Sequence, residues 1–354
     1  MIEFKKYIPK FLKYPLIAIY ILLRCVFRGT AKKEIALNLA GVLPTRESKE
    51  VVHGGKVKLL HLRERFGDAW RHFNIAYFGS SSLPFAPGIW IKMYKLFGVK
   101  IIWNQNGVAY PALYPAGTVE NINKLLMPMH LSDYVVYQTE FVKRCADKYL
   151  GKFGGPNSVI INPVDTEHFK PVETPLSQEP LTIIMLGNHF ESKERMDVST
   201  ESLRILRKKG AELKLIIIGR IQYDIEEDWI EKRGAYLQED APALMQSGHI
   251  FLHLKYMDPC PTAVLEALAS GLPVVALNSG GLPEMVNGDA GILLPVVENF
   301  EKLHYPRAED AAEAIMRIRQ NLPDFSRGAR RQALKFDKKV WLAKHAEIFN
   351  NLLK

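Results

Sequence analysis

From residue 34 onward, short apolar segments alternate with longer amphipathic ones, and this alternation limits the folds open to the chain. Such a pattern is typical of βαβ units, in which helices join parallel strands and cover the sheet. Ten segments are predicted to be strands, in two groups of five: 34–40, 73–78, 99–104, 134–138 and 158–161, and then 181–186, 213–218, 250–254, 274–276 and 291–294. The sequence therefore predicts an α/β protein with two doubly wound sheets.

The chain is predicted to divide into two domains, because 354 residues suit two domains of roughly 150 residues each. A proline-rich, polar stretch separates the two groups of strands and indicates a linker. We expect an N-terminal arm over residues 1–33, a first domain over 34–172 and a second over 173–337, with helices in the second at 196–209, 242–246 and 262–270. Ligands of such sheets bind beyond the carboxyl ends of the strands, so the site is expected in the crevice between the domains.

Most of the excess positive charge lies in the N-terminal arm. Residues 1–33 contain eight Lys and Arg residues and one Glu, a net +7 out of the +9 of the whole chain. A nucleic-acid-binding protein spreads its Lys and Arg over a folded face, whereas these charges flank a run rich in Ile, Leu and Tyr. The composition therefore favours an anionic membrane surface, and not a nucleic acid, as the partner of the arm.

The arm is predicted to lie on a membrane without crossing it. Its uncharged run, residues 14–23, has ten residues, about half of the roughly 20 that a spanning helix needs. The basic residues that follow it lack the cleavage site of a signal peptide. As a helix, the arm would gather five basic residues in one sector that suits the headgroup plane: Lys6, Lys10, Lys13, Arg24 and Arg28. Packing of the arm against its own domain is the alternative.

Three cysteines, at positions 25, 145 and 260, are far apart and odd in number. They imply neither a disulfide framework nor a zinc site, which favours a reducing compartment. Together with the arm, this predicts a cytoplasmic protein attached peripherally to the cytoplasmic face of a membrane.

Residues 258–281, DPCPTAVLEALASGLPVVALNSGG, form the densest motif. Two prolines precede a predicted helix that begins at Thr262, Gly271 ends this helix, and a buried strand leads to a glycine pair. A helix that begins at the carboxyl edge of a sheet offers N–H groups and the positive end of its dipole to a diphosphate. Glu266 is positioned to accept hydrogen bonds from a ribose, and Asp258 from a sugar. Complementing the dipole of its own helix is the alternative role of Glu266.

This motif resembles the signature of the retaining GT-B glycosyltransferases of family 4, also called glycosyl transferases group 1. In that family the stretch reads approximately E-G-F-G-x-x-x-L-E-A-x-A-x-G-x-P-V-V, followed by two glycines and P-E. Asp258 stands in place of the first glutamate, and residues 259–261 in place of G-F-G. Twelve residues match in register: Leu265, Glu266, Ala267, Ala269, Gly271, Pro273, Val274, Val275, Gly280, Gly281, Pro283 and Glu284.

Two further segments carry the resemblance into the first domain. Residues 162–171, NPVDTEHFKP, resemble the family's N-G-V-D-x-x-x-F-x-P, and Gly54 and Gly55 resemble its glycine-rich loop after the first strand. The resemblance implies a GT-B fold, in which two Rossmann-like domains face a central cleft and a C-terminal helix, here 338–354, crosses back to the first domain.

The implied activity is transfer of a sugar from a UDP- or GDP-sugar to a hydroxyl of a glycan or lipid-linked acceptor. The resemblance implies that the second domain holds the donor and the first the acceptor, that the anomeric configuration is retained, and that the product belongs to a cell-envelope polysaccharide or glycoconjugate. The sequence contains no D-x-D motif, which fits a site that needs no divalent metal, and no cofactor is expected.

The site residues follow from these motifs and their neighbours. Catalytic roles are expected of Lys193, Asp258 and Glu266, with Lys193 and the first N–H groups of the helix at Thr262 stabilising the leaving diphosphate. Asn106 is expected to contact the acceptor or the transferred sugar. Donor binding is expected of eleven residues: Gly54, Gly55, Gly187, Asn188, Arg195, Arg220, Pro261, Thr262, Ala263, Gly280 and Gly281.

Besides residues 258–261, the chain departs from the family pattern at two further places. The family's G-R-x-x-x-x-K-G motif has Asn188 in place of its arginine, so Arg195 or Arg220 is expected to supply the missing phosphate cation. Many relatives carry a histidine after the third strand, where this chain has the amides of residues 104–106, WNQNG being the local sequence. The histidines nearby in sequence, His53 and His130, are expected to be ordinary surface or core residues.

Two other functions compete with sugar transfer. A non-catalytic protein that binds nucleotide sugars or glycans is the alternative, because the departures at Asn106, Asn188 and Asp258 fall on positions of the expected site. A dehydrogenase is disfavoured, because no G-x-G-x-x-G follows a predicted strand.

Overall fold

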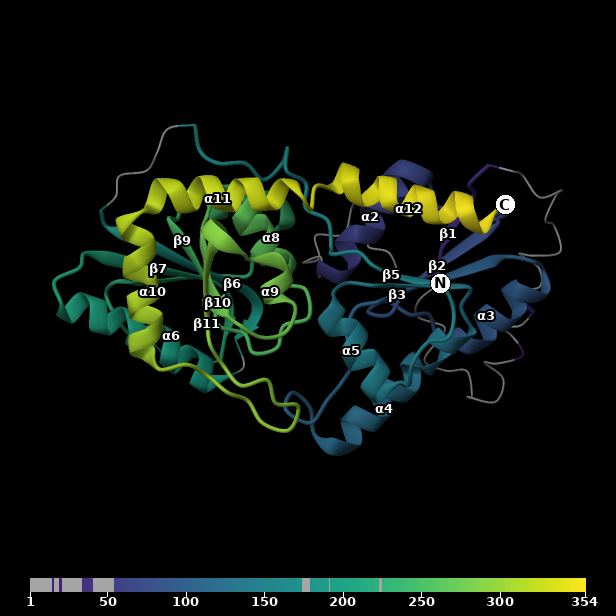
Figure 1. Ribbon diagram of the computed structural model, residues 1–354, viewed down its shortest axis with the longest axis horizontal. Coiled ribbons are helices and arrows are strands. Elements are labelled where there is room, and N and C mark those ends of the chain that lie inside the picture. Colours follow the sequence, from purple (N-terminus) through teal and green to yellow (C-terminus); the bar gives the residue numbers. More distant parts are fainter. Residues whose placement is uncertain are drawn as a thin grey trace.

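The computed structural model describes residues 15, 19–20, 34–40, 54–173, 179–190, 192–222 and 225–354, without the side chains of 54–56, 188, 189 and 238. The predicted membrane arm therefore lies outside the described residues except for three positions, and so does His53. Figure 1 shows two α/β lobes side by side, each with a central sheet covered by helices. Within the described part of the chain, no helix combines the length and the apolar character that crossing a bilayer requires.

Among the described residues, the first sheet has five parallel strands in the order β1-β2-β3-β4-β5. The strands are β1 (Leu37–Leu39), β2 (Ile75–Gly79), β3 (Lys100–Gln105), β4 (Tyr134–Tyr137) and β5 (Asn157–Val159). The helices between them are α2 (Gly54–Phe66), α3 (Pro87–Leu96), α4 (Ala116–Leu126), the 3-10 turn η2 (Met127–Leu131) and α5 (Glu140–Tyr149). Strands β2, β3 and β4 are almost wholly buried, because helices cover both faces of a parallel sheet.

The second sheet, within the part of the chain that the structure describes, has six parallel strands in the order β11-β10-β9-β6-β7-β8. The strands are β6 (Leu181–Phe190), β7 (Leu213–Ile221), β8 (Ile230–Gly234), β9 (Ile250–His253), β10 (Val274–Leu277) and β11 (Gly291–Leu294). The helical segments are α6 (Lys193–Lys208), η3 (Gln238–Asp240), α7 (Ala241–Gln246), α8 (Thr262–Ala269), α9 (Leu282–Met285), η4 (Gly288–Ala290), α10 (Ala308–Gln320) and α11 (Leu322–Leu334).

Strand order reverses beside β6, because the chain first adds β7 and β8 on one side and then β9 to β11 on the other. In open parallel sheets such a switch point leaves a crevice at the carboxyl ends of the two central strands, where ligands bind. The loops that follow β6 and β9 are therefore the ones best placed to form a site.

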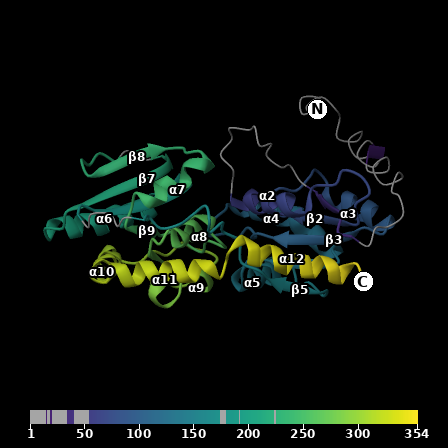
Figure 2. The same ribbon diagram turned by 90° about the horizontal axis from the view of Figure 1, so that it is seen from above.

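The last helix, α12 (Lys338–Leu352), leaves the second lobe and lies over the first (Figures 1 and 2). Its Trp341 and Phe349 pack in one apolar cluster with Leu59 of α2 and Tyr77 of β2. His345 is fully buried there, 3.1 Å from the Tyr77 hydroxyl, and burial lowers the pKa of His345 to about 3. This helix therefore contributes a neutral, buried face to the core of the first domain.

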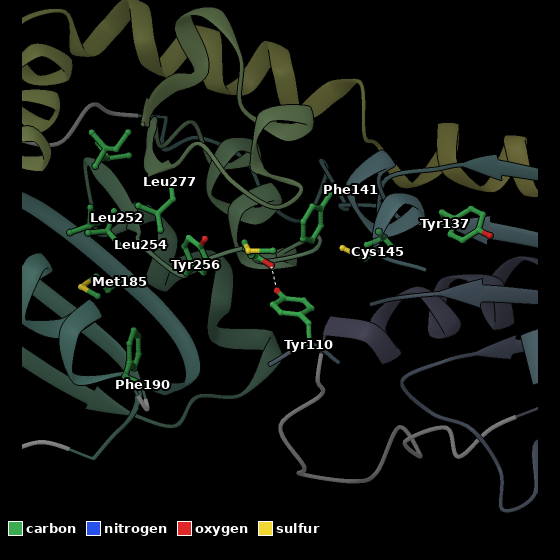
Figure 3. Packing of buried hydrophobic residues seen from close by; sticks show 14 of the residues in the cluster. Tyr110, Tyr137, Phe141, Cys145, Met185, Phe190, Leu252, Leu254, Tyr256 and Leu277 are labelled. Carbon is green, nitrogen blue, oxygen red and sulfur yellow. Dashed lines mark hydrogen bonds between the residues drawn. The ribbon is translucent and has the colours of Figure 1, made fainter. Parts of the chain in front are cut away.

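The two domains also share apolar contacts near the cleft. Phe300, in the segment after β11, stacks on Phe141 and meets Tyr110 and Tyr149 edge-on. Figure 3 shows Tyr110, Phe141 and Cys145 at this junction, with the hydrogen bond from the Tyr110 hydroxyl drawn toward the second domain. The largest apolar cluster consequently runs through both domains.

Candidate functional site

Asp258 lies in the loop after β9, beside the switch point of the second sheet. Its carboxylate is buried and lies 3.2 Å from both His253 Nε2 and Lys255 Nζ. Burial opposes the charged form, but Lys255 and His253 together outweigh it and hold the pKa of Asp258 below its usual range. Burial also lowers the pKa of His253, so a neutral imidazole donates from Nε2 to a carboxylate that stays ionised.

Arg195, near the start of α6, brings a buried positive charge to the same place. Its side chain is 5% exposed and its guanidinium lies 4.8 Å from the centre of the Phe190 ring. Burial lowers the pKa of Arg195 to about 10, while the charges of Asp258 and Tyr305 oppose this shift. Within the described part of the chain, the Nε and Nη2 atoms have no hydrogen-bond partner. Buried donors without partners are rare in folded proteins, so these atoms point to a ligand.

Lys193 is the first residue of α6, and its ammonium is directed to the surface. The Nζ atom lies 2.8 Å from Asp197, one turn along the helix, and the side chain is 67% exposed. Ser192 caps the helix by accepting a hydrogen bond from the Arg195 N–H, and its hydroxyl also lies 2.9 Å from the Tyr305 hydroxyl. Of the two cations at this end of α6, Arg195 is therefore the buried one. The catalytic role expected of Lys193 stays a prediction.

Helix α8 begins where the sequence motif predicts. Pro261 is its N-cap and supplies no side-chain hydrogen bond, so Thr262 and Ala263 stand at an end whose first N–H groups have no side-chain cap. Glu266 is buried in the same helix. Burial raises the pKa of the Tyr236 phenol, and the negative charge of Glu266 adds to this rise, which places the two groups close together.

The glycines of the motif have a steric role. Gly280 has φ +66°, and a Cβ atom there would overlap the carbonyl oxygen of Asp258. A Cβ atom at Gly281 would overlap the carbonyl oxygen of Pro259, and the Gly281 N–H donates to the Asp258 carbonyl at 2.9 Å. Both glycines therefore let the turn after β10 pack tightly against the loop that carries Asp258. Their predicted contact with the donor stays a prediction.

The other predicted donor residues lie at strand and helix ends. Gly187 lies in β6, and a side chain at the neighbouring Gly219 would overlap its carbonyl group. Arg220 is exposed near the end of β7 and pairs in register with His189, while the side chain of Asn188 is outside the described part. Gly54 and Gly55 are the first two residues of α2, and not part of a loop as the resemblance implies.

Lys58, one turn into α2, was not predicted from the sequence. It is fully buried, and its ammonium donates to Asn106 Oδ1 at 2.5 Å and to Asn162 Oδ1 at 3.3 Å, while the amide of Gln138 completes the cluster. Burial lowers the pKa of Lys58 to about 7. The sequence does contain one signal for this residue, because Lys58 follows Gly54 by four residues in the segment after the first strand. Its partners Asn106 and Asn162 lie far away in the chain, so the sequence does not indicate that the lysine is buried.

This cluster gives the free energy of unfolding a specific pH dependence. Unfolded, the Lys58 side chain keeps its proton up to its ordinary pKa of 10.5, whereas in the folded protein it loses the proton near pH 7. Between these values the unfolded chain binds one more proton, so stability rises with pH, by about 1 kcal/mol per pH unit. Urea unfolding of wild type and Lys58→Met should be compared at pH 7 and pH 9. The free energy of unfolding of wild type should rise relative to that of Lys58→Met between these two pH values. The exposed Lys124→Met is the control, and equal pH slopes in wild type and Lys58→Met would contradict the buried charge.

First-domain side chains fix the loop that precedes α8. Tyr110 donates to the Met257 carbonyl at 3.1 Å, Thr139 to the Pro259 carbonyl at 3.0 Å, and Asn162 to the Cys260 carbonyl at 3.2 Å. In the opposite direction, the carboxylate of Glu284 accepts from the N–H groups of Glu140 and Phe141 at 2.8 and 3.0 Å, which caps α5. The cleft residues thus depend on contacts from both domains.

The three amides at the end of β3, residues 104–106, differ in what they bind. Gln105 binds Trp103 and the Gly107 carbonyl, and Asn104 donates to the Val136 carbonyl, so both serve the fold. Asn106 accepts from Lys58 and donates to the Ser81 hydroxyl at the edge of the cleft. His130 lies 2.8 Å from the Leu150 carbonyl, which agrees with the structural role expected of it.

Part of the chain is similar in sequence to known glycosyltransferases. Residues 180–321 match the family model described as Glycosyl transferases group 1. The putative colanic acid biosynthesis glycosyltransferase WcaL of Escherichia coli (strain K12) is 30% identical over 149 residues, covering 37% of this chain and 36% of that protein. The amylovoran biosynthesis glycosyltransferase AmsK of Erwinia amylovora is 29% identical over 134 residues, covering 33% of each protein. The chain thus spans about a third of the length of the curated relatives it matches.

Solved structures resemble the chain over most of its length. Anabaena Alr3699/HepE in complex with UDP-glucose has a TM-score of 0.64 at 13% identity, covering 89% of this chain and 99% of that chain. Sucrose-phosphate synthase from Thermosynechococcus elongatus has a TM-score of 0.61 at 14% identity, covering 84% of this chain and 77% of that chain. At such identities the likeness shows the fold alone, and it confirms the predicted GT-B arrangement of two Rossmann-like domains.

Proposed function

We propose that this chain transfers a sugar from a nucleotide-sugar donor to an acceptor hydroxyl. Residues 180–321 match the family model described as Glycosyl transferases group 1, which supports this proposal. The observation that carries the proposal is the pairing of opposite charges at the switch point. There the buried Arg195 has donors without described partners, beside the ionised Asp258. A nucleotide sugar matches this pairing, because its diphosphate is anionic while its reacting sugar becomes cationic.

The proposed reaction breaks the bond between the anomeric carbon and the diphosphate oxygen and forms a bond from that carbon to the acceptor oxygen. Charge develops on the leaving diphosphate, which Arg195, Lys193 and the N–H groups at Thr262 would stabilise. The acceptor hydroxyl attacks from the face that the diphosphate leaves, and its proton passes to a leaving phosphate oxygen, so the anomeric configuration is retained. Protein cations and N–H groups take the place of a metal in this proposal, and no cofactor takes part. Asp258 would accept hydrogen bonds from the sugar or stabilise its developing positive charge.

UDP- or GDP-sugars are the proposed donors, and a glycan or lipid-linked molecule the proposed acceptor. Support for the donor class comes from HepE, whose structure contains UDP-glucose. WcaL and AmsK are named for colanic acid and amylovoran biosynthesis, which supports a role in making cell-envelope polysaccharides or glycoconjugates. Glu266 is proposed to bind the ribose of the donor.

A panel of UDP-, GDP- and ADP-sugars tests the function directly. The matching donor should raise the thermal unfolding temperature, because a ligand that binds only the folded state stabilises it. The same donor should then be consumed when acceptor extract is added, as measured by release of the nucleoside diphosphate. Stabilisation without turnover on any extract would instead favour the non-catalytic binding protein.

Peripheral attachment to an anionic membrane through residues 1–33 is part of the proposal, and the net +7 of this arm supports it. Each basic residue near an anionic leaflet contributes about 1 kcal/mol. Flotation with anionic vesicles should therefore recover the full chain and lose it when residues 1–33 are deleted. Equal flotation of both proteins would rule out the arm as the anchor.

A further inference from the structure

A cavity of about 280 Å³ opens beside the site, between the two domains. The first domain lines most of it, through the loop after β3 and helices α4 and α5, and the second domain adds Lys255 and Pro259. Lys255 pairs with Asp258, so the cavity is continuous with the loop that carries the proposed catalytic carboxylate. The view in Figure 3 includes three of its lining side chains, Tyr110, Phe141 and Cys145.

The lining of the cavity combines two kinds of side chain. Lys255, which pairs with Asp258, and Asn106 and Ser81, which bind each other, supply polar groups. Ile122 and Leu126 of α4 and Phe141 and Val142 of α5 supply apolar ones.

Two groups among the apolar part of the lining that could bind a polar ligand, the Tyr110 hydroxyl and the Cys145 thiol, are already used or neutral. The Tyr110 hydroxyl donates to the Met257 carbonyl, so it is not available as a donor to a ligand. Burial raises the pKa of the Cys145 thiol to about 12, so the thiol is uncharged at neutral pH. A sugar ring placed here would bury hydroxyls without partners, which costs free energy for each one.

We propose that this cavity binds an aliphatic chain, alkyl or isoprenoid, that belongs to the acceptor. The inference rests on the proposed sugar transfer and narrows its acceptor to an amphiphile. The hydroxyl that receives the sugar lies near the polar groups of Asn106 and Lys255, and the chain extends from it between α4 and α5. Leu113 and Tyr114 are exposed members of the lining, so the cavity reaches the surface beside apolar groups that suit such a chain.

The size of the cavity sets the length of chain that it accommodates. At about 30 Å³ for each water-sized group, 280 Å³ holds roughly nine such groups. Each methylene buried should tighten binding about fourfold. The gain should therefore continue to a chain of roughly nine carbons and then stop, because further carbons remain in water.

Calorimetric binding of n-alkyl glucosides with 4 to 12 carbons, below their micellar concentrations, tests this with the full-length protein. All members of the series carry the same glucose headgroup, so its contribution to the binding free energy cancels when two successive chain lengths are compared. The expected result is a steady fall in Kd followed by a plateau. A Kd that does not depend on chain length, or one that falls without a plateau to the longest chain, would overturn the proposal.

Variants of α4 move the plateau in opposite directions. Leu126→Ala removes three carbons from the cavity wall and should extend the plateau by about three carbons. Leu125→Ala is the matched control, because this neighbouring side chain is 61% exposed and does not line the cavity. Ile122→Trp should fill the cavity and abolish the dependence of Kd on chain length. Because Ile122 is partly exposed, this variant should fold, and it provides the test if Leu126→Ala does not fold. An unmoved plateau in both variants would place the chain elsewhere.

The calorimetric test also separates the cavity from the enzyme activity. A plateau in binding combined with no transfer from any nucleotide sugar would refute the proposed function and leave the ligand class intact. Transfer to acceptors at a rate that does not depend on chain length would refute the cavity assignment and leave the enzyme intact.

Discussion

Replacing Glu266 by Gln should lower kcat/KM for sugar transfer by about 100-fold while the protein stays folded. A hydrogen bond to a charged carboxylate contributes about 1.5 to 3 kcal/mol, or one to two decades each, and a ribose offers two hydroxyls. Gln keeps the shape of the buried side chain and removes its charge. Initial rates with the matching donor measure this loss of kcat/KM. Glu313→Gln, which changes an exposed acid on α10, is the control and should keep the wild-type rate.

The alternative role of Glu266 makes the opposite prediction. An acid that only complements its own helix dipole would contribute about 0.3 to 1 kcal/mol to stability and nothing to turnover. A Glu266→Gln protein that is slightly less stable and transfers sugar at a near-normal rate would therefore refute the donor role.

Replacing Arg195 by Met should also lower kcat/KM by about 100-fold, because the leaving diphosphate would lose a buried cation. The loss should exceed that of Lys193→Met, because the Lys193 ammonium is exposed to water and already pairs with Asp197. Binding of the nucleoside diphosphate, measured by calorimetry, should weaken in the same order. Arg204→Met, on the outer part of the same helix and paired with Glu227, is the control.

Stability separates a binding role of Arg195 from a structural one. Asp258 keeps His253 and Lys255 as partners when Arg195 is removed, and no described residue accepts from Nε or Nη2. The free energy of unfolding of Arg195→Met should therefore stay close to that of wild type. A large loss of stability with unchanged nucleotide binding would assign Arg195 to the core and leave the donor cation to Lys193.

The fold was largely predictable because buried parallel strands leave a local signal. All ten predicted strands are present, with ends displaced by a few residues. Strand β8 was missed, because this edge strand, Ile230–Gly234, carries three charged residues and lacks an apolar run. Helix α8 was predicted to within one residue, because prolines and a glycine mark both of its ends.

The site was predictable only where its residues are close in sequence. The predicted segment 258–281 does bring Asp258, Gly280 and Gly281 together, but as packing partners whose contact with a donor stays a prediction. Lys58 was missed because its partners Asn106 and Asn162 are 48 and 104 residues away. Pairing over such distances depends on the way in which the strands bring their carboxyl ends to one edge, and no spacing in the sequence records it.

The capping of α5 by Glu284 has a consequence for movement of the two lobes. If the lobes swing apart, the N–H groups of Glu140 and Phe141 at the start of α5 lose the Glu284 carboxylate that accepts from them, and water must replace it. The same swing releases the carbonyl groups of Met257, Pro259 and Cys260 from their first-domain donors. The swing also separates Phe300 from Phe141, Tyr110 and Tyr149. Each exchanged hydrogen bond costs about 0.5 to 1.5 kcal/mol, so the closed arrangement of the lobes is favoured by the sum of these contacts.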